Sequence, residues 1–430
     1  RYGEKYNTLF LNTHYDFSRE GGLATAVELC NGAGVCRKKN EGTMCPSYMV
    51  TMEDVHSTRG RANYMREILS GKVDLQEFSG KALHDALDLC LECKGCKAEC
   101  PSNVDMAKLK YEFLAHYNEA NGTPLRSQVF ARIHSLSKMA SVWPSLANSV
   151  MARPVVRKPL DRYIGIDARR SLPPLATQTF EAWFRKRTRP KIAKPVGKVV
   201  LFHDTFVDFN YPEVGKATTT LLNAAGYEVE LSERQCCGRP MISKGLPEAA
   251  RANAAFNVAR LSLFVEQGYS IVGCEPSCIL TFRDEYPDLL KGHAVQAVAK
   301  ASYLLEEFIV REKAANRWKL EFKRQDVKAL IHGHCHEKAL IGSRFLKEAV
   351  ALAYSVEEID SGCCGMAGSF GFEKEHYDLS MAIGRRRLFP AVERQPDALV
   401  VAPGVSCRQQ VEHATGKKAL HPAEALVLAL

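Results

Sequence analysis

The sequence predicts a protein of mixed α+β and α/β class, in which a small helical domain precedes a doubled α/β domain with pseudo-twofold symmetry. Three observations support this prediction. Cysteine and glycine are concentrated between residues 26 and 121, and after residue 195 short apolar strands alternate with helices. A motif of two cysteines before a glycine also occurs twice, as Cys236-Cys237-Gly238 and Cys363-Cys364-Gly365.

The chain of 430 residues is long enough for more than one core, because single cores stop growing near about 250–300 residues. It begins at Arg1 rather than methionine, so we expect it to be a fragment or a processed piece of a longer protein. The sequence contains no apolar run of about 18 residues, so it predicts neither a signal peptide nor a transmembrane helix. Composition divides the chain into a lead-in at 1–25, a cysteine-rich domain at 26–121, a basic connector at 122–195 and repeats at 196–325 and 326–430.

Helices are predicted where apolar residues recur at helical spacing, and strands where short apolar runs occur between turns. The expected helices lie at residues 57–69, 78–90, 104–117, 250–266, 345–354 and 376–389. The expected strands lie at residues 198–202, 228–231, 270–273, 327–332, 356–360 and 398–402. Such alternation implies parallel sheets covered on both faces. In the connector, helices are expected to be interrupted by Pro144, Pro154, Pro159, Pro173, Pro174 and Pro190.

Cysteine is the most informative residue type. The chain has 15 cysteines, an odd number, and they lie in tight groups beside glycine and proline rather than spread out as in a disulfide framework. Such groups indicate metal binding in a reducing compartment, so we expect a cytoplasmic protein.

The spacing Cys90-x2-Cys93-x2-Cys96-x3-Cys100-Pro101 is that of a bacterial ferredoxin. In this pattern a short loop directs three thiolates to one cluster, and the fourth thiolate reaches a second cluster. Zinc is the alternative, but zinc sites typically use two separated cysteine pairs. The small helical domain is therefore predicted to be a ferredoxin-like domain with two iron–sulfur clusters.

A looser run, Cys30-x5-Cys36-x8-Cys45-Pro46, supplies the remaining ligands. Cross-ligation predicts one complete 4Fe-4S cluster held by Cys45, Cys90, Cys93 and Cys96. The second cluster would take Cys30, Cys36 and Cys100, and its missing ligand falls at Ala33. We expect either a 3Fe-4S cluster there or a 4Fe-4S cluster with a ligand that is not cysteine, for which His56 is a candidate.

Further motifs carry a family resemblance: Cys30-Asn31-Gly32, the segment 42–48 (GTMCPSY) and the segment 56–61 (HSTRGR). With the ferredoxin run, they resemble the C-terminal iron–sulfur half of FAD-linked D-2-hydroxyacid dehydrogenases, such as those for D-lactate and D-2-hydroxyglutarate. The same two modules resemble the iron–sulfur subunit of glycolate oxidase and the corresponding subunit of anaerobic glycerol-3-phosphate dehydrogenase. The resemblance implies that residues 1–25 lead in from a flavin domain, or that a separate subunit carries the flavin.

No Gly-x-Gly-x-x-Gly follows a predicted strand, so FAD and the hydride step are expected on that partner domain or subunit. The resemblance also implies that a quinone or another acceptor receives the electrons. We expect an oligomer, and no nucleic acid partner.

The doubled domain resembles the cysteine-rich subunit of heterodisulfide reductase, whose repeats supply cysteine ligands to an unusual cluster. Both repeats depart from that pattern: Thr205 stands at the leading position of the first, and Pro403 replaces one cysteine of the second. Eight candidate metal ligands remain, namely Cys236, Cys237, Cys274, Cys278, Cys335, Cys363, Cys364 and Cys407. Mixed ligation would use the histidines beside the gaps, His203, His332, His334 and His336. Buried free cysteines and a strained disulfide are the alternatives.

The net charge of +9 is concentrated in the connector. Basic runs are usually solvated or packing surface, and nothing here resembles a nucleic-acid-binding fold. A second interpretation is contact with the inner face of a membrane, with Trp143, Trp183 and Phe184 among the lipid headgroups. The anionic lipid would then meet Arg153, Arg157, Lys158, Arg185, Lys186 and Arg187.

The leading functional hypothesis is an electron relay from reduced flavin to the final acceptor. The alternatives are a thiol–disulfide oxidoreductase like heterodisulfide reductase and a structural metal protein whose basic stretch binds nucleic acid.

Overall fold

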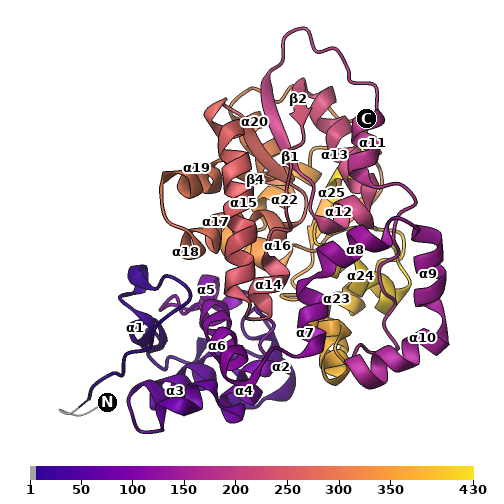
Figure 1. Cartoon of the computed structure of the whole chain (residues 1–430). Coiled ribbons are helices and arrows are strands. Elements are labelled where there is room, and N and C mark those ends of the chain that lie inside the picture. Colours follow the sequence, from indigo (N-terminus) through magenta and orange to yellow (C-terminus); the bar gives the residue numbers. More distant parts are fainter. Residues whose placement is uncertain (1–5) are drawn as a thin grey trace.

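The structure is a computed structural model that describes residues 6–430, and its N-terminal third is helical (Figure 1). The helices up to residue 121 are α1 (Leu23–Glu28), α2 (Pro46–Thr51), α3 (Thr58–Leu69), α4 (Lys81–Asp88), α5 (Gly95–Glu99) and α6 (Met106–Asn121). The Ser57 side chain caps α3 by accepting from the N–H of Gly60, and Asp105 caps α6 in the same way. Residues 62, 65, 68 and 69 of α3 form its buried face and pack in the core of this region with residues of α6.

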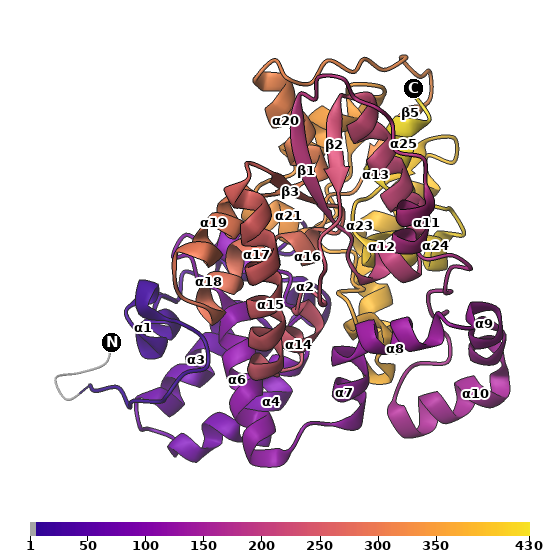
Figure 2. The same ribbon diagram turned by 45° about the horizontal axis from the view of Figure 1, so that its top comes forward.

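The connector consists of short helices, the middle ones of which lie at the edge of the molecule (Figures 1 and 2). They are α7 (Leu125–Ala131), α8 (Ile133–Ala140), α9 (Pro144–Ala152), α10 (Pro154–Pro159) and α11 (Phe180–Lys186). Pro144 and Pro154 occupy the first positions of α9 and α10, where a missing N–H is tolerated. These two prolines therefore begin helices. The fully buried Arg170 ties the connector to the second repeat by donating to the Gly371 carbonyl, Gln410 and Ser380.

Two parallel sheets follow, as predicted. The first has the order β2-β1-β3-β4, and its strands are β1 (Gly197–Phe202), β2 (Tyr227–Glu230), β3 (Ser270–Gly273) and β4 (Ser302–Leu304). The second has the order β6-β5-β7, and its strands are β5 (Lys328–Ile331), β6 (Ser355–Glu358) and β7 (Leu399–Val401). A parallel bridge between Val401 and Leu420 stands where β4 stands in the first sheet. The mixed α/β class is thus confirmed, and β4 is a strand that the sequence pattern did not predict.

The helices of the first repeat are α12 (Thr205–Phe209), α13 (Pro212–Ala224), α14 (Arg239–Ser243), α15 (Pro247–Glu266), α16 (Pro276–Ile279), α17 (Thr281–Asp284), α18 (Tyr286–Leu289), α19 (His293–Ala301) and α20 (Leu305–Ala314). Those of the second are α21 (Cys335–Leu340), α22 (Arg344–Val350), α23 (Tyr377–Glu393), α24 (Val405–Thr415) and α25 (Pro422–Val427). The predicted boundary at residue 25 lies within α1, and the other three lie at or between the ends of elements.

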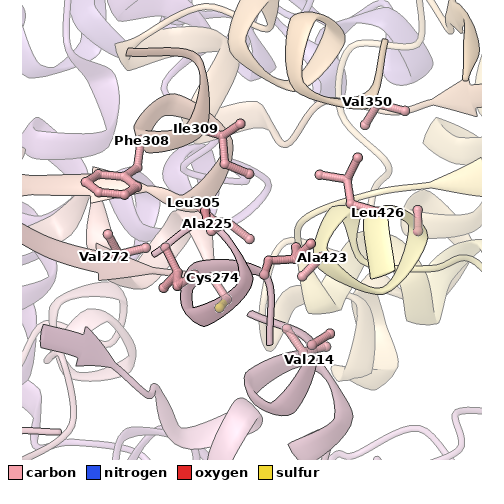
Figure 3. Close-up of a cluster of buried hydrophobic side chains, with 14 of the residues drawn as sticks. Val214, Ala225, Val272, Cys274, Leu305, Phe308, Ile309, Val350, Ala423 and Leu426 are labelled. Carbon is pink, nitrogen blue, oxygen red and sulfur yellow. The ribbon is translucent and has the colours of Figure 1, made fainter. Parts of the chain in front are cut away.

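The two repeats share one hydrophobic core (Figure 3). Helix α13 of the first repeat packs on α25 of the second, and α22 of the second packs on α20 of the first. Side chains such as Leu305, Ile309, Val350 and Leu426 are fully buried there. Each contributes about 1.5–3 kcal/mol by burial, so the lobes are held together as one body. This reciprocal packing is the pattern that pseudo-twofold symmetry produces.

Among the described residues, none of the helices combines the length and apolar character that crossing a bilayer requires.

Candidate metal centres

Four thiols of the helical region converge at one place, which we call the inner site: Cys45, Cys90, Cys93 and Cys96. Cys45 immediately precedes α2, Cys90 and Cys93 lie between α4 and α5, and Cys96 lies in α5. The chain turns tightly around Cys93 because Glu92 (φ 55°) and Lys94 (φ 58°) both adopt left-handed backbone conformations. The structure therefore brings together the four residues that spacing assigns to the complete cluster.

The chemistry of the inner site fits an iron–sulfur cluster. Burial raises the pKa of the Cys90 and Cys93 thiols, so metal binding must compensate the charge when they ionise. The backbone N–H of Gly95 donates to Cys93, and Arg61 donates from Nη1 to the Cys45 sulfur at 3.5 Å. Hydrogen bonds of this kind to the sulfurs tune clusters in proteins.

A second group, the outer site, consists of Cys30, Cys36 and Cys100 around one small cavity. Ala33 lines the same cavity, at the position where a fourth thiol is missing. His56 does not line it: its Nδ1 lies 3.0 Å from the Thr51 hydroxyl oxygen, and its carbonyl accepts from Ser47. The structure thus groups the three cysteines and leaves His56 outside the group.

The loop of the inner site is fixed against both repeats. Lys94, only 2% exposed, forms ion pairs with Asp284 and, at 2.6 Å, with Glu285 of the first repeat. On the other side, the His336 ring bonds through Nε2 to the Glu92 carbonyl at 2.9 Å. Buried charge pairs resist separation, because removing one partner leaves the other charge buried and uncompensated. The inner site is therefore held in a defined position relative to both repeats.

The second repeat gathers its predicted ligands into one group, the second-repeat site: His332, Cys335, Cys363, Cys364 and Cys407. One ring nitrogen of His332 lies within 4.8 Å of the Cys364 and Cys407 sulfurs. The His332 Nδ1 bonds to the Ser361 hydroxyl at 2.6 Å, and its Nε2 has no hydrogen-bond partner among the described residues. A hydrogen bond from Cys363 lowers the pKa of Cys335 to about 7. Such a set of thiols and imidazole suits iron or zinc.

The first repeat gathers a smaller group, the first-repeat site: Cys236, Cys237 and Cys278. The Cys237 and Cys278 sulfurs are 3.1 Å apart, and the Thr205 Oγ1 lies 4.0 Å from the Cys236 sulfur. Thr205 therefore does occupy the place of the leading ligand. Cys274, by contrast, lies in the shared hydrophobic core beside Thr218, apart from these three thiols (Figure 3).

The glycine of each Cys-Cys-Gly motif has a left-handed backbone, with φ of 87° at Gly238 and 92° at Gly365. Only glycine adopts this conformation readily, so both motifs turn sharply and present adjacent thiols to one place. A Cβ at Gly365 would also clash with the Ser380 carbonyl oxygen, at 2.2 Å. A Cβ at Gly238 would lie 3.6 Å from Ala250, which is an ordinary van der Waals distance.

The inner site adjoins the second-repeat site. Cys93, Cys335 and Cys363 belong to one buried group of packed side chains, and the Cys335 sulfur adds to the effect of burial in raising the pKa of Cys93. The helix that begins at Cys335, α21, packs directly on α5 of the inner site. Predicted ligands that lie about 240 residues apart in sequence thus become neighbours.

Sequence reasoning missed the side chains that support these sites. Arg61 lies in the segment 56–61 used for the family resemblance, so its motif was an available signal. No sequence motif could have identified Lys94 as a supporting residue, because its partners Asp284 and Glu285 are remote in sequence. The positions of His203 and His334 also depend on remote residues: Glu181 and Glu275 are their respective neighbours, at 3.8 and 4.0 Å.

Comparison with known proteins identifies both halves of the chain. Residues 29–105 match the family described as "4Fe-4S dicluster domain", and residues 200–283 and 344–412 match "Cysteine-rich domain". The predicted iron–sulfur clusters are confirmed by this match. The sequence is 31% identical to one subunit of the anaerobic glycerol-3-phosphate dehydrogenase of Escherichia coli strain K12, over 77% of this chain and 83% of that protein.

Two other relatives extend the comparison. D-2-hydroxyglutarate dehydrogenase of Escherichia coli strain K12 is 26% identical over 93% of this chain, which spans only 43% of that protein's length. Lactate utilization protein A 2 of Bacillus cereus strain Q1 is 27% identical over 54% of this chain and 99% of that protein. These matches confirm the resemblance inferred from the motifs. With a dicluster domain, a doubled cysteine-rich domain and a relative of this similarity, the chain belongs to the family of that anaerobic glycerol-3-phosphate dehydrogenase subunit.

Proposed function

We propose that this chain is the electron-relay part of an FAD-dependent D-2-hydroxyacid dehydrogenase, passing electrons from flavin on a partner domain or subunit to a quinone or other acceptor. The observation that carries the proposal is the buried series of thiols from the outer site through the inner site to the second-repeat site. Bound iron–sulfur clusters supply one-electron transfer. The protein contributes burial, fixed geometry and hydrogen bonds to sulfur.

The exposure of the sites gives the relay a direction. At the outer site Asn31, Gly32 and Ala33 are exposed and Cys100 is partly exposed, so a flavin partner can approach it there. The inner site is buried against both repeats. Electrons would therefore enter beside Cys100 and leave beside Cys335.

The ligand sets follow from this grouping. We assign Cys45, Cys90, Cys93 and Cys96 to a 4Fe-4S cluster, and Cys30, Cys36 and Cys100 to a cluster with three cysteine ligands. The second-repeat site would hold a further iron centre with mixed ligation, for which the His332 Nε2 is well suited. The Ser361 hydroxyl fixes the other nitrogen of that ring.

A second candidate function is a thiol–disulfide oxidoreductase. It is favoured by the 3.1 Å separation of the Cys237 and Cys278 sulfurs, which both line a cavity. A substrate disulfide could reach thiols at this place.

Cofactor analysis of the anaerobically purified chain tests the relay. We expect iron and acid-labile sulfide for two clusters at least, paramagnetic resonance signals on reduction with dithionite, and no FAD. Zinc in place of iron, or stoichiometric FAD bound to this chain, would contradict the proposal.

A membrane-facing surface would bring a lipophilic acceptor within reach. On α8 to α10 and the turns around them, Met139, Val142, Trp143, Leu146 and Val155 are 60–72% exposed. Both ribbon views have α9 and α10 at the edge of the molecule. Lys138, Arg153 and Lys158 are exposed beside them, and each would contribute about 1 kcal/mol on an anionic bilayer. The sequence-based choice of Phe184 was wrong, because that ring is 2% exposed in the shared core, and Arg157 is buried as well.

Vesicle cosedimentation measures this contact. We expect binding to phosphatidylcholine vesicles only when they contain phosphatidylglycerol, and a loss of at least 5-fold in Trp143→Glu, since a charge replaces the ring most suited to the interface. The matched control is Leu263→Glu, at an exposed position of α15 in the first repeat. Equal binding by the two variants would rule out this surface.

A further inference from the structure

A cavity of about 380 Å³ lies where the helical region, the connector and both repeats meet. Its sulfur-bearing wall consists of Cys90, Cys236, Cys237, Cys278 and Cys335. These residues belong to the inner, first-repeat and second-repeat sites. The volume falls within the range of small-ligand sites, about 300–1,000 Å³. A molecule in this cavity would therefore lie beside three of the four sites, all except the outer site.

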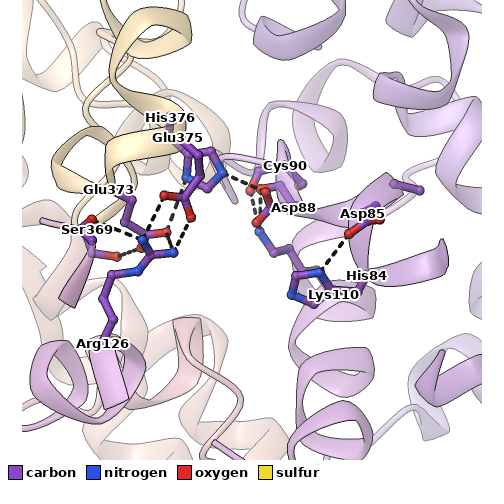
Figure 4. A network of polar contacts seen from close by, with 12 residues as sticks. His84, Asp85, Asp88, Cys90, Lys110, Arg126, Ser369, Glu373, Glu375 and His376 are labelled. Carbon is purple, nitrogen blue, oxygen red and sulfur yellow. Dashed lines mark hydrogen bonds and ion pairs between the residues drawn. The ribbon is translucent and has the colours of Figure 1, made fainter. Parts of the chain in front are cut away.

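The cations of the wall already pair with opposite charges, as Figure 4 shows for Arg126. Arg126 lies between Glu373 and Glu375, with 3.2 Å between its Nη2 and the Glu373 Oε2. Lys244 contacts the same Glu373 at 2.5 Å. The other two cations of the wall pair as Lys110 with Glu92 and Arg239 with Glu285. An anionic ligand would therefore have to compete with a carboxylate for each cation of the described wall residues.

Aromatic and aliphatic side chains cover much of the remaining wall. They are Phe130 of α7, Ile133 of α8, Phe206 of α12, and Phe370 and Phe372 before α23. Flat apolar surfaces of this kind favour an uncharged planar ring.

We propose that this cavity binds the electron acceptor, and that the acceptor is an uncharged aromatic molecule of the quinone class. The inference rests on the proposed relay, and it adds the site and the charge of the acceptor. Two electrons, delivered singly from the dehydrogenase side, and two protons from water convert the two ring carbonyls to hydroxyls. Phe130 and Ile133 lie on the helices that lead to the exposed Met139 and Trp143, so an apolar tail can leave toward the proposed membrane surface.

Calorimetric titration of the anaerobic, iron-loaded chain with 2,3-dimethyl-1,4-naphthoquinone tests the site, because this quinone has no free ring position for thiols to attack. In Ser127→Trp, where an indole would fill the cavity from α7, we expect Kd to rise at least 10-fold. Leu125→Trp is the matched control, on the same helix but outside the cavity, and should bind like the unmodified chain. An analogue with a propanoate in place of one methyl should bind at least 10-fold more weakly than the parent quinone.

Unchanged binding in Ser127→Trp, or tighter binding of the propanoate or of an anionic disulfide, would overturn the proposal. The outcomes also separate the site from the relay. Quinone that binds but receives no electrons from the dithionite-reduced chain would contradict the relay. A reduced chain that transfers electrons to ferricyanide but binds no quinone would contradict the cavity assignment alone.

Discussion

Replacing Cys93 with serine is expected to remove or convert the cluster of the inner site and to loosen the helical region. Cys93 is buried among three other thiols, and its loop contacts both repeats through Glu92 and Lys94. Because the two cysteine runs supply both sites, loss of one thiol also disturbs the outer site. We expect a loss of up to about four iron atoms per chain, measured as iron and acid-labile sulfide.

The comparison that makes this result specific is Cys36→Ser. Cys36 belongs to the outer site, so its replacement should remove a different paramagnetic resonance signal and change that of the inner site less than Cys93→Ser does. Cys274→Ser serves as the control for an equally buried thiol in the shared core, and should retain all iron. Full iron content in Cys93→Ser would refute the ligand assignment.

The local parts of the fold and of the sites could be predicted from sequence. The ferredoxin spacing is a property of one loop, and the strands at 198–202 and 270–273 are short apolar runs. These features are therefore determined by residues that are neighbours in the sequence. The position of Thr205 beside Cys236 also followed, because the repeat aligns it with a ligand position.

Features that depend on packing could not be predicted. Cys274 has the sequence context of a ligand, yet the end of β3 directs it toward Thr218 in the core between the lobes. Phe184 looks exposed in a basic run, but α11 packs against the first repeat and buries it. The approach of Cys93 to Cys335 joins two distant segments, and neither periodicity nor spacing reports such a contact.

The second large effect is expected for Cys364→Ser, which should abolish electron delivery to the acceptor while both clusters of the helical region remain reducible. Cys364 interacts with Cys363, Cys407 and His332, which makes it the central member of the second-repeat site. The neighbouring Cys363 and Cys407 thiols and the nearby His332 ring hold the pKa of Cys364 well below its usual range, which favours the thiolate form that binds metal. Stopped-flow measurements should show normal reduction of the clusters and at least 100-fold slower oxidation by the quinone.

This prediction separates a metal centre from a set of buried free thiols. A serine oxygen preserves the size of the side chain, so a merely structural Cys364 would lose about 1–3 kcal/mol of unfolding free energy and little transfer rate. Cys274→Ser would have the same structural effect without a change in transfer, since that thiol lies apart from the site. If the two variants transfer electrons equally fast, the relay does not pass through the second repeat, and the role of its thiols must be sought in the oxidoreductase alternative.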